Sequence, residues 1–214
     1  MSVISYITYN DTIIVNKILN DIEQLIKKVS PYGGKVFGEY VTNCVIPRIT
    51  DRNCNVDFVS VDILFEYKAQ FLQYFERLKD SVPDTTEFAI VTRMQFTGNV
   101  LVNLYVSQTQ LAHFDVELLM YNYNDTFPHL SSNSNTHELT KSIENKTITI
   151  LPLVLIKIES AHIWKICRYL NKGWTFKLDD RTLSGQNLDN KSVYIFLKPK
   201  TTLSIEEQKI INNL

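Results

Sequence analysis

Three acidic residues in the middle of the chain have the types and the spacing to bind a metal ion. Asp115 and Glu117 are two residues apart in an apolar segment, Phe114 to Met120, which reads as a β-strand. Residues i and i+2 of a strand share one face, so both carboxylates are expected to point the same way. With Asp62 they could form a cluster of three acids, and such hard oxygen ligands suit magnesium. The alternative is that they are exposed acids at a strand edge with no ligand.

A second group of residues has the charge to bind phosphate. An apolar periodicity predicts a helix from Leu153 to Leu170, and the spacing of its basic residues puts them along one face. These basic residues are Lys157, Lys165, Arg168 and Lys172, with Trp164, Tyr169 and Trp174 close by. Cations beside aromatic rings are typical of surfaces that bind single-stranded nucleic acid, so residues 157–172 are a possible nucleic-acid surface. The alternative is a solvated basic face whose aromatic residues pack inward.

The elements that must position these residues read as a mixture of helices and strands. Apolar residues at helical spacing predict a first helix over residues 13–26, ended by Pro31 to Gly34. Strands are expected at 35–37, 59–65, 88–91, 100–106, 114–120 and 193–197, and helices at 38–46, 66–78, 137–144, 153–170 and 204–213. Pro47 is expected to end the second helix. The pattern predicts an α+β fold with a mixed sheet in the middle of the chain.

The polar segment Asn122 to Thr136 is the expected domain boundary. The predicted organisation is a core of residues 1–122, a polar loop of residues 123–136, and a smaller, mainly helical part of residues 137–214. A chain of 214 residues with 44% hydrophobic residues is long enough for one sizeable core.

A short segment carries a family resemblance. It reads Val36-Phe37-Gly38-Glu39-Tyr40-Val41-Thr42-Asn43, then Ser60-Val61-Asp62-Ile63, and later Phe114-Asp115-Val116. The order and spacing resemble the nucleotidyltransferase superfamily, whose members have a glycine motif opening a helix, an Asp-x-Asp pair on the next strand, and a third Asp on a later strand. The resemblance covers roughly residues 33–175 and is closest to the giant-virus, mimivirus-like branch. It implies a DNA polymerase beta-like fold and, in a viral setting, a location in the host cytoplasm or the virion.

The superfamily motif serves a two-metal reaction, in which carboxylates hold divalent ions that activate a hydroxyl and neutralise the transferring phosphate. Backbone N–H groups at the glycine turn would meet the triphosphate. The resemblance implies that Gly38, Glu39 and Ser60, with Lys165, Arg168 and Lys172, line a nucleotide site. It also implies that Asp62 and Asp115 are catalytic if the protein is active.

This chain departs from the motif at the positions that define the activity. Ser60 stands where the first Asp of the pair belongs, and in the alternative register, Asn55 to Asp57, an Asn stands there. Glu39 occupies the position of a second Gly or Ser, and Thr42-Asn43 replaces an Arg-Asp pair. We therefore expect a catalytically impaired relative that acts as a binding, scaffolding or regulatory module, through a protein partner or self-association. The alternative is an active, magnesium-dependent transferase that moves a nucleotide from a triphosphate to a hydroxyl.

Composition sets limits on other functions. A formal net charge of −1 gives no overall attraction to polyphosphate, so nucleic-acid binding needs a local patch. The three cysteines form no CxxC pair, which predicts neither a disulfide framework nor a zinc site. No segment has the apolar length of a membrane span, so a cytosolic protein that is not secreted is expected.

Overall fold

The computed structural model describes residues 9–50, 52, 60–81, 89–95, 100–108, 112–126 and 128–198. Their elements make an α+β structure, as the sequence predicts. The chain divides into two compact units, residues 1–111 with 119–133 and residues 112–118 with 134–214. The expected terminal helix 204–213 and the alternative register 55–57 lie outside the described residues.

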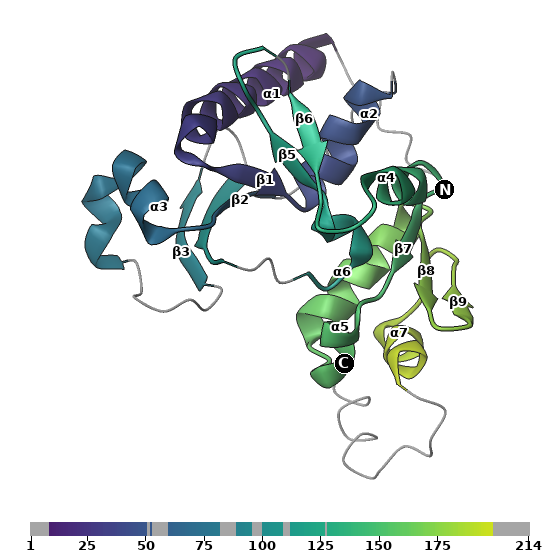
Figure 1. Cartoon of the computed structure of the whole chain (residues 1–214). Coiled ribbons are helices and arrows are strands. Elements are labelled where there is room, and N and C mark those ends of the chain that lie inside the picture. The colour runs from purple at the N-terminus through teal and green to yellow at the C-terminus, as the bar shows by residue number, and fades with distance from the viewer. Residues whose placement is uncertain are drawn as a thin grey trace. The chain divides into compact units, whose positions relative to one another are not determined.

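The first unit contains a mixed sheet, drawn in blue and teal in Figure 1. Its strands are β1 (Lys35–Phe37), β2 (Ser60–Phe65), β3 (Ala89–Gln95), β4 (Leu101–Val106), β5 (Met120–Asn122) and β6 (His129–Ser131). Six strands lie in the order β3-β4-β2-β1-β5-β6. Strands β2 and β4 run parallel, and the remaining neighbours run antiparallel. The polar segment expected as a loop therefore contributes β6 to the sheet.

Helices pack against one face of this sheet. They are α1 (Tyr9–Val29), a π-helical turn η2 (Val41–Val45), α2 (Ile46–Ile49) and α3 (Lys68–Tyr74), with short 3₁₀ turns at Ser30–Tyr32 and Glu76–Ser81. Ile22 and Ile26, four residues apart on α1, are fully buried. Phe71 of α3 contacts Phe65 of β2 edge-to-face with ring centroids 5.4 Å apart. This face of β2, which also carries Val61 and Ile63, is the hydrophobic core of the unit.

The opposite face of the same sheet carries Ser60 and Asp62 of β2. The strand register pairs Phe37 with both Asp62 and Met120, so these three side chains share a face. Phe37, Leu64 and Met120 form a small buried cluster there, against which Tyr105 packs. Asp62 thus lies at the border between this apolar cluster and the polar end of β2.

The helix after β1 does not end at Pro47, which corrects the sequence prediction. It continues through Ile49, with Pro47 in the first turn of α2. The physical reason is the π-turn before it, where the N–H of Ile46 donates to the carbonyl of Val41, five residues earlier. A proline at the start of the new α-helical turn has no N–H to satisfy, so it does not break the helix.

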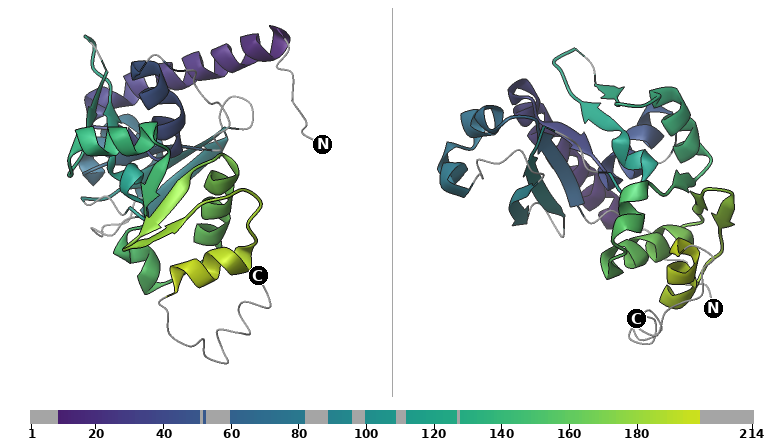
Figure 2. Two further views of the ribbon diagram at one scale, coloured as in Figure 1. Left: turned by 90° about the vertical axis from the view of Figure 1, so that its right-hand side faces the viewer. Right: turned by 60° about the horizontal axis from the view of Figure 1, so that its bottom comes forward.

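The second unit combines helices with a small sheet. Its helices are α4 (Thr136–Glu144), α5 (Pro152–Ile156), α6 (Ser160–Asn171) and α7 (Asn190–Leu197), and its strands are β7 (Thr147–Thr149), β8 (Thr175–Leu178) and β9 (Arg181–Leu183). The strands lie in the order β7-β8-β9. Figure 2 shows α6 beside β8. The sequence predicts a mainly helical C-terminal part and does not indicate the short strands of this sheet.

Two element predictions in the second unit are wrong. Residues 193–197, predicted as a strand, form α7, because the Asp189 side chain accepts a hydrogen bond from the Ser192 N–H at 2.8 Å and caps a helix. The single helix predicted at 153–170 is two helices, because Lys157 is extended (φ −146°, ψ 102°). Glu159 then caps α6, where its backbone N–H donates to Nδ1 of His162 at 3.2 Å.

The structure also bears on the predictions about membrane spans and cysteines. Among the described residues, no helix combines the length and the apolar character needed to cross a membrane. Cys44, fully buried, is disulfide-bonded, whereas Cys167 is a free thiol. The bond at Cys44 corrects the expectation that the cysteines are unbridged, and the cytosolic location stays a prediction.

Candidate functional site

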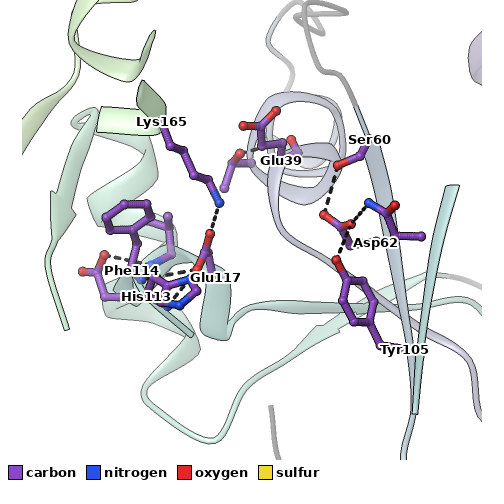
Figure 3. Close-up of polar contacts among 12 residues, drawn as sticks. Glu39, Ser60, Asp62, Tyr105, His113, Phe114, Glu117 and Lys165 are labelled. Carbon is purple, nitrogen blue, oxygen red and sulfur yellow. Dashed lines mark hydrogen bonds and ion pairs between the residues drawn. The ribbon is translucent and has the colours of Figure 1, made fainter. Parts of the chain in front are cut away.

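Asp62 lies at the centre of a hydrogen-bonded cluster on the face of the first unit's sheet that is opposite its hydrophobic core (Figure 3). Ser60, two residues earlier on β2, donates from Oγ to Oδ2 of Asp62 at 3.2 Å. Asn103 donates from Nδ2 to Oδ1 at 2.6 Å. The Tyr105 hydroxyl donates to the same Oδ1 at 3.3 Å. The carboxylate therefore receives three hydrogen bonds from neutral side chains of its own unit.

Asn103 holds the position directly opposite Asp62 on the neighbouring strand. Strands β2 and β4 are parallel, and their register pairs Asp62 with Asn103. The Asn103 side chain belongs to a residue only 5% exposed, and its Oδ1 accepts a hydrogen bond from Nε of Arg93 at 2.7 Å. Since its oxygen is held by Arg93, its amide nitrogen is the group that faces Asp62. The neighbouring strand thus directs a hydrogen-bond donor at Asp62, whereas a metal ion there would need an oxygen ligand from this position.

Gly38 brings the backbone close to Asp62. It follows β1 with φ +75°, a conformation that favours glycine. A Cβ added at Gly38 would lie 3.0 Å from Oδ2 of Asp62, so the absence of a side chain allows the close approach. Glu39 begins the helix after this turn and is 5% exposed. The sequence-predicted residues Gly38, Ser60 and Asp62 are therefore brought together, with Glu39 adjacent along the chain.

Asp115 and Glu117 do not lie on a strand, which corrects the prediction of two carboxylates on one strand face. They belong to a 3₁₀ turn, η4 (Asp115–Leu118), and η4 is part of the second unit. The turn forms because side-chain oxygens bind nearby backbone donors in place of a strand partner. Oε2 of Glu117 accepts from the N–H groups of His113 at 2.9 Å and Phe114 at 3.3 Å.

The carboxylate of Glu117 is also held by a cation. The residue is 6% exposed, and its Oε1 forms an ion pair with Nζ of Lys165 on α6 (Figure 3). Burial raises the pKa of Glu117, but the charge and hydrogen bond of Lys165 together with the backbone donor of His113 outweigh it, so the net pKa is lowered. Lys165 also lies 5.3 Å from the centre of the Phe114 ring. Both oxygens of Glu117 are thus engaged within the second unit.

Asp115 has a different environment from Glu117. Its Oδ1 accepts hydrogen bonds from the N–H of Val116 and from the N–H of Thr149 on β7, both at 2.8 Å. Burial raises the pKa of Asp115 more than these hydrogen bonds lower it. The carboxylate therefore ties η4 to the small sheet, which is a structural task in the second unit.

The four basic residues expected along one helix face have separate surroundings. Lys157 lies in the extended link before α6 and pairs with Glu159 at 2.8 Å. Lys165 is paired with Glu117, as described above. Arg168 lies 4.9 Å from the centre of the Trp164 ring, and Lys172 caps the end of α6. Because Lys157 is outside α6, the continuous stripe of the sequence prediction is reduced to α6 and its C-cap.

The described residue ranges contain no group of acids or other ligands suited to a metal. Within these ranges, no three side chains of His, Cys, Asp or Glu come together as a group that could hold a metal ion. The residues of β2 and β4 that are described as hydrogen-bonding to Asp62 are Ser60, Asn103 and Tyr105, which carry hydroxyls and an amide rather than carboxylates.

Sequence reasoning missed Asn103, Arg93 and Tyr105. A signal was present, because Asn103 is the most polar residue of an otherwise apolar strand and shares a face with Leu101 and Tyr105. What the sequence did not show is that β4 runs beside β2 in a register that places Asn103 opposite Asp62.

Comparisons with known proteins add nothing to this geometry. No protein-family model matches the chain, and no curated protein matches it.

Proposed function

We propose that this chain is a nucleotidyltransferase-like protein of giant-virus type whose catalytic site is impaired and which acts as a binding, scaffolding or regulatory module. The resemblance over residues 33–175 supports the family part of the proposal. The arrangement of the first unit supports it further, because a glycine turn after β1 lies against an acid on the next strand in sequence, β2. A protein partner or a second copy of the chain is the expected ligand of such a module.

The observation that carries the loss of catalysis is the amide of Asn103 opposite Asp62. Two-metal phosphoryl transfer needs several carboxylates converging on two divalent ions. Two strand positions beside Asp62 could carry further carboxylates, but they hold Ser60 and Asn103. Both residues donate hydrogen bonds to Asp62. A metal at Asp62 would have to displace these donors, and neither Ser60 nor Asn103 would supply a second negative charge. The cluster therefore stabilises the Asp62 carboxylate without a metal.

Rebuilding the missing acids tests this reasoning. The variant Ser60→Asp/Asn103→Asp creates three carboxylates on one sheet face, and adding Arg93→Gln removes the cation that would compete for the new acid on β4. We expect the unmodified protein to bind no manganese at Asp62, and the triple variant to bind it, as measured by electron paramagnetic resonance of free and bound Mn²⁺. Manganese is a suitable probe because it accepts the same hard oxygen ligands as magnesium.

The matched control is Ser60→Asn/Asn103→Leu with Arg93→Gln, which alters the same three positions without adding an acid. The proposal predicts that this control stays unable to bind Mn²⁺. Two outcomes contradict it: Mn²⁺ binding by the unmodified protein that disappears in Asp62→Asn, or a triple variant that folds but binds no better than the control.

The alternative function is an active transferase with Asp62, Asp115 and either Glu117 or Glu39 as magnesium ligands. One observation favours it, namely that Gly38 retains the positive φ and the close approach to Asp62 that a phosphate-binding turn requires. Incubation with α-labelled triphosphates, Mg²⁺ and a pool of RNA or protein acceptors distinguishes the active transferase from the binding module. Label transfer that is lost in Asp62→Asn supports the enzyme, and its absence supports the binding module.

A further inference from the structure

A pocket in the first unit lies on the sheet face opposite to Asp62. Its volume is about 410 Å³, and it is lined by residues of α1, the helix 41–49, the end of β5 and the β5–β6 loop. The lining includes Glu23, Arg48, Ile49, Tyr121, Tyr123 and Pro128. Tyr121 pairs with Val36, whereas Asp62 pairs with Phe37, so Tyr121 and Asp62 point to opposite faces. The pocket is therefore separate from the nucleotidyltransferase-like cluster, and nothing in its case depends on the proposed function.

A polar cluster forms one wall of this pocket. The carboxylate of Glu23 accepts hydrogen bonds from the Tyr40 hydroxyl at 2.6 Å and the Tyr121 hydroxyl at 3.3 Å. It also forms an ion pair with Arg48. Burial, followed by the charge of Glu23, raises the pKa of both tyrosines, so each hydroxyl keeps its proton and stays a donor. Glu23 is thus bound by two tyrosine hydroxyls and by Arg48, and the cluster holds Arg48 in place at the pocket wall.

Arg48 retains donors for a ligand. Its guanidinium has five N–H donors, and within the described part of the chain it binds Glu23 through Nη2. The Arg48 side chain is 39% exposed, against 17% for Glu23, so the cation faces the opening more than the anion does. A guanidinium fixed on one side by a carboxylate is preorganised to bind a second anion with its outer edge.

The remaining walls are apolar and aromatic. Tyr121 and Tyr123 meet edge-to-face with ring centroids 6.4 Å apart, and Pro128 and the 55% exposed Ile49 flank them. Tyr123 also lines an adjoining pocket of about 240 Å³, where Lys27 lies 5.9 Å from the centre of its ring. Asp125 also lines this adjoining pocket and balances the charge of Lys27, so the preference for a negatively charged ligand rests on Arg48.

We propose that this pocket binds a small aromatic anion, with its ring between Tyr121, Tyr123 and Ile49 and its carboxylate or phosphate on the outer edge of Arg48. The volume is within the usual range of small-ligand sites, and the lining is that of such sites, mostly apolar with a few polar groups, here the ion pair of Glu23 and Arg48. An aromatic ring among tyrosines gains both buried area and edge-to-face contact. A neutral aromatic ligand would gain the buried area and the edge-to-face contact, but it would not gain the contact with Arg48.

The probe for this site is 8-anilinonaphthalene-1-sulfonate, and its neutral analogue N-phenyl-1-naphthylamine has the same rings without the sulfonate. Fluorescence titration of the full chain is expected to show saturable binding of the anionic probe. In Glu23→Gln/Arg48→Met, which removes both charges and leaves no buried ion unpaired, the anionic probe should bind at least about tenfold more weakly. The neutral probe should bind this variant and the unmodified protein equally.

Two further variants keep the test decisive if that double change harms folding. Arg48→Lys keeps the charge but loses the planar fork, and we expect it to weaken the anionic probe alone. Trp164→Ala removes an exposed aromatic residue of the second unit, 58% exposed, and should leave binding of both probes unchanged. Equal binding of the anionic probe by the unmodified and the Arg48 variants, or loss of binding in Trp164→Ala, would overturn the proposal.

Competition identifies the acidic group. Phenylacetate and phenyl phosphate carry the same ring with a carboxylate or a phosphate, and displacement of the probe by one more than the other assigns the natural head group. Failure of both to displace the probe at about 1 mM would overturn the proposal, because a specific site for an aromatic anion should bind one of them at least this well.

Discussion

The amide nitrogen of Asn103 lies 2.6 Å from Oδ1 of Asp62, and the two residues face one another across the parallel strands β4 and β2. Arg93 holds the other end of the amide, so the donor is directed at the carboxylate. Under the proposed loss of catalysis, this amide stands at the strand position where two-metal chemistry would need a further carboxylate.

Removal of the Asp62 carboxylate should lower stability rather than an activity. In Asp62→Ala, the nearly buried amide of Asn103 loses its acceptor, and Ser60 and Tyr105 lose theirs. We expect a loss of about 1 to 3 kcal/mol in the free energy of unfolding. Chemical denaturation followed by circular dichroism measures it. Ser60→Ala, which removes one donor and leaves Asp62 bound to the other two, should cost less; an equal or larger loss in that variant would contradict this assignment.

The close approach of Gly38 to Asp62 gives a double-mutant cycle. Gly38→Ala combines a backbone held at φ +75° with a Cβ 3.0 Å from Oδ2 of Asp62, and should destabilise the protein by about 1 to 3 kcal/mol. In the Asp62→Ala background the contact is gone, because Cβ of residue 62 is 4.0 Å away, and only the backbone part of the cost remains. Additive effects of the two changes in denaturation would show that the contact is absent.

The ion pair between Lys165 and Glu117 should be costly to break from one side. Lys165→Met leaves the Glu117 carboxylate buried without its cation, and we expect a loss of about 3 to 5 kcal/mol in the free energy of unfolding. The variant Lys165→Met/Glu117→Gln should recover much of this loss. The exposed pair of Lys157 and Glu159 is the control, and Lys157→Met should leave the thermal midpoint unchanged.

The surroundings of His162 predict a pH dependence of stability. Burial, followed by the neighbouring charge of His113, lowers the pKa of His162 below its ordinary value of 6.5, and Glu159, Glu117 and Lys165 also act on it. The unfolded chain therefore binds a proton before the folded one does as the pH falls below about 6.5, and stability must fall with it. Denaturation midpoints measured from pH 7.5 downwards should decline, and more steeply than in His162→Gln.

Asp115 contributes to the pH dependence of stability with the sign opposite to that of His162, and its contribution starts to change at a lower pH. Its pKa is raised from 3.8, so its stabilising contribution is complete below that pH and declines as the pH rises through its folded pKa. A midpoint that stays level between about pH 7.5 and pH 6 would contradict the assignment to His162.

The sequence predicted β1 to β4 and the Gly38 turn of the first unit because these depend on local patterns, but it did not predict β5 or β6. Alternating apolar residues mark β2 and β4, and the polar members of each set occupy the other face. It did not predict which strands are neighbours, and the role of Asn103 depends on that pairing alone. Such pairings are set by packing of the whole sheet, which a local pattern does not contain.

The wrong element predictions share a physical cause. Asp189 and Glu117 accept hydrogen bonds from backbone N–H groups close by in the chain, and the His162 side chain accepts one from the N–H of Glu159. These bonds start α7, fold η4 and start α6. Apolar periodicity alone favours a strand at 193–197 and at 114–120, and one long helix at 153–170. A side chain that satisfies backbone donors locally decides between such alternatives.

The most direct test of the impaired site is isothermal titration of the protein with ATP, CTP, GTP and UTP, each with and without Mg²⁺. We predict that Mg²⁺ produces no gain in affinity for any triphosphate, because Asp62 is bound by Ser60 on β2 and Asn103 on β4 rather than accompanied there by further carboxylates. Binding of a triphosphate at micromolar strength that requires Mg²⁺ and is lost in Asp62→Asn would contradict the proposed loss of catalysis and favour the active transferase.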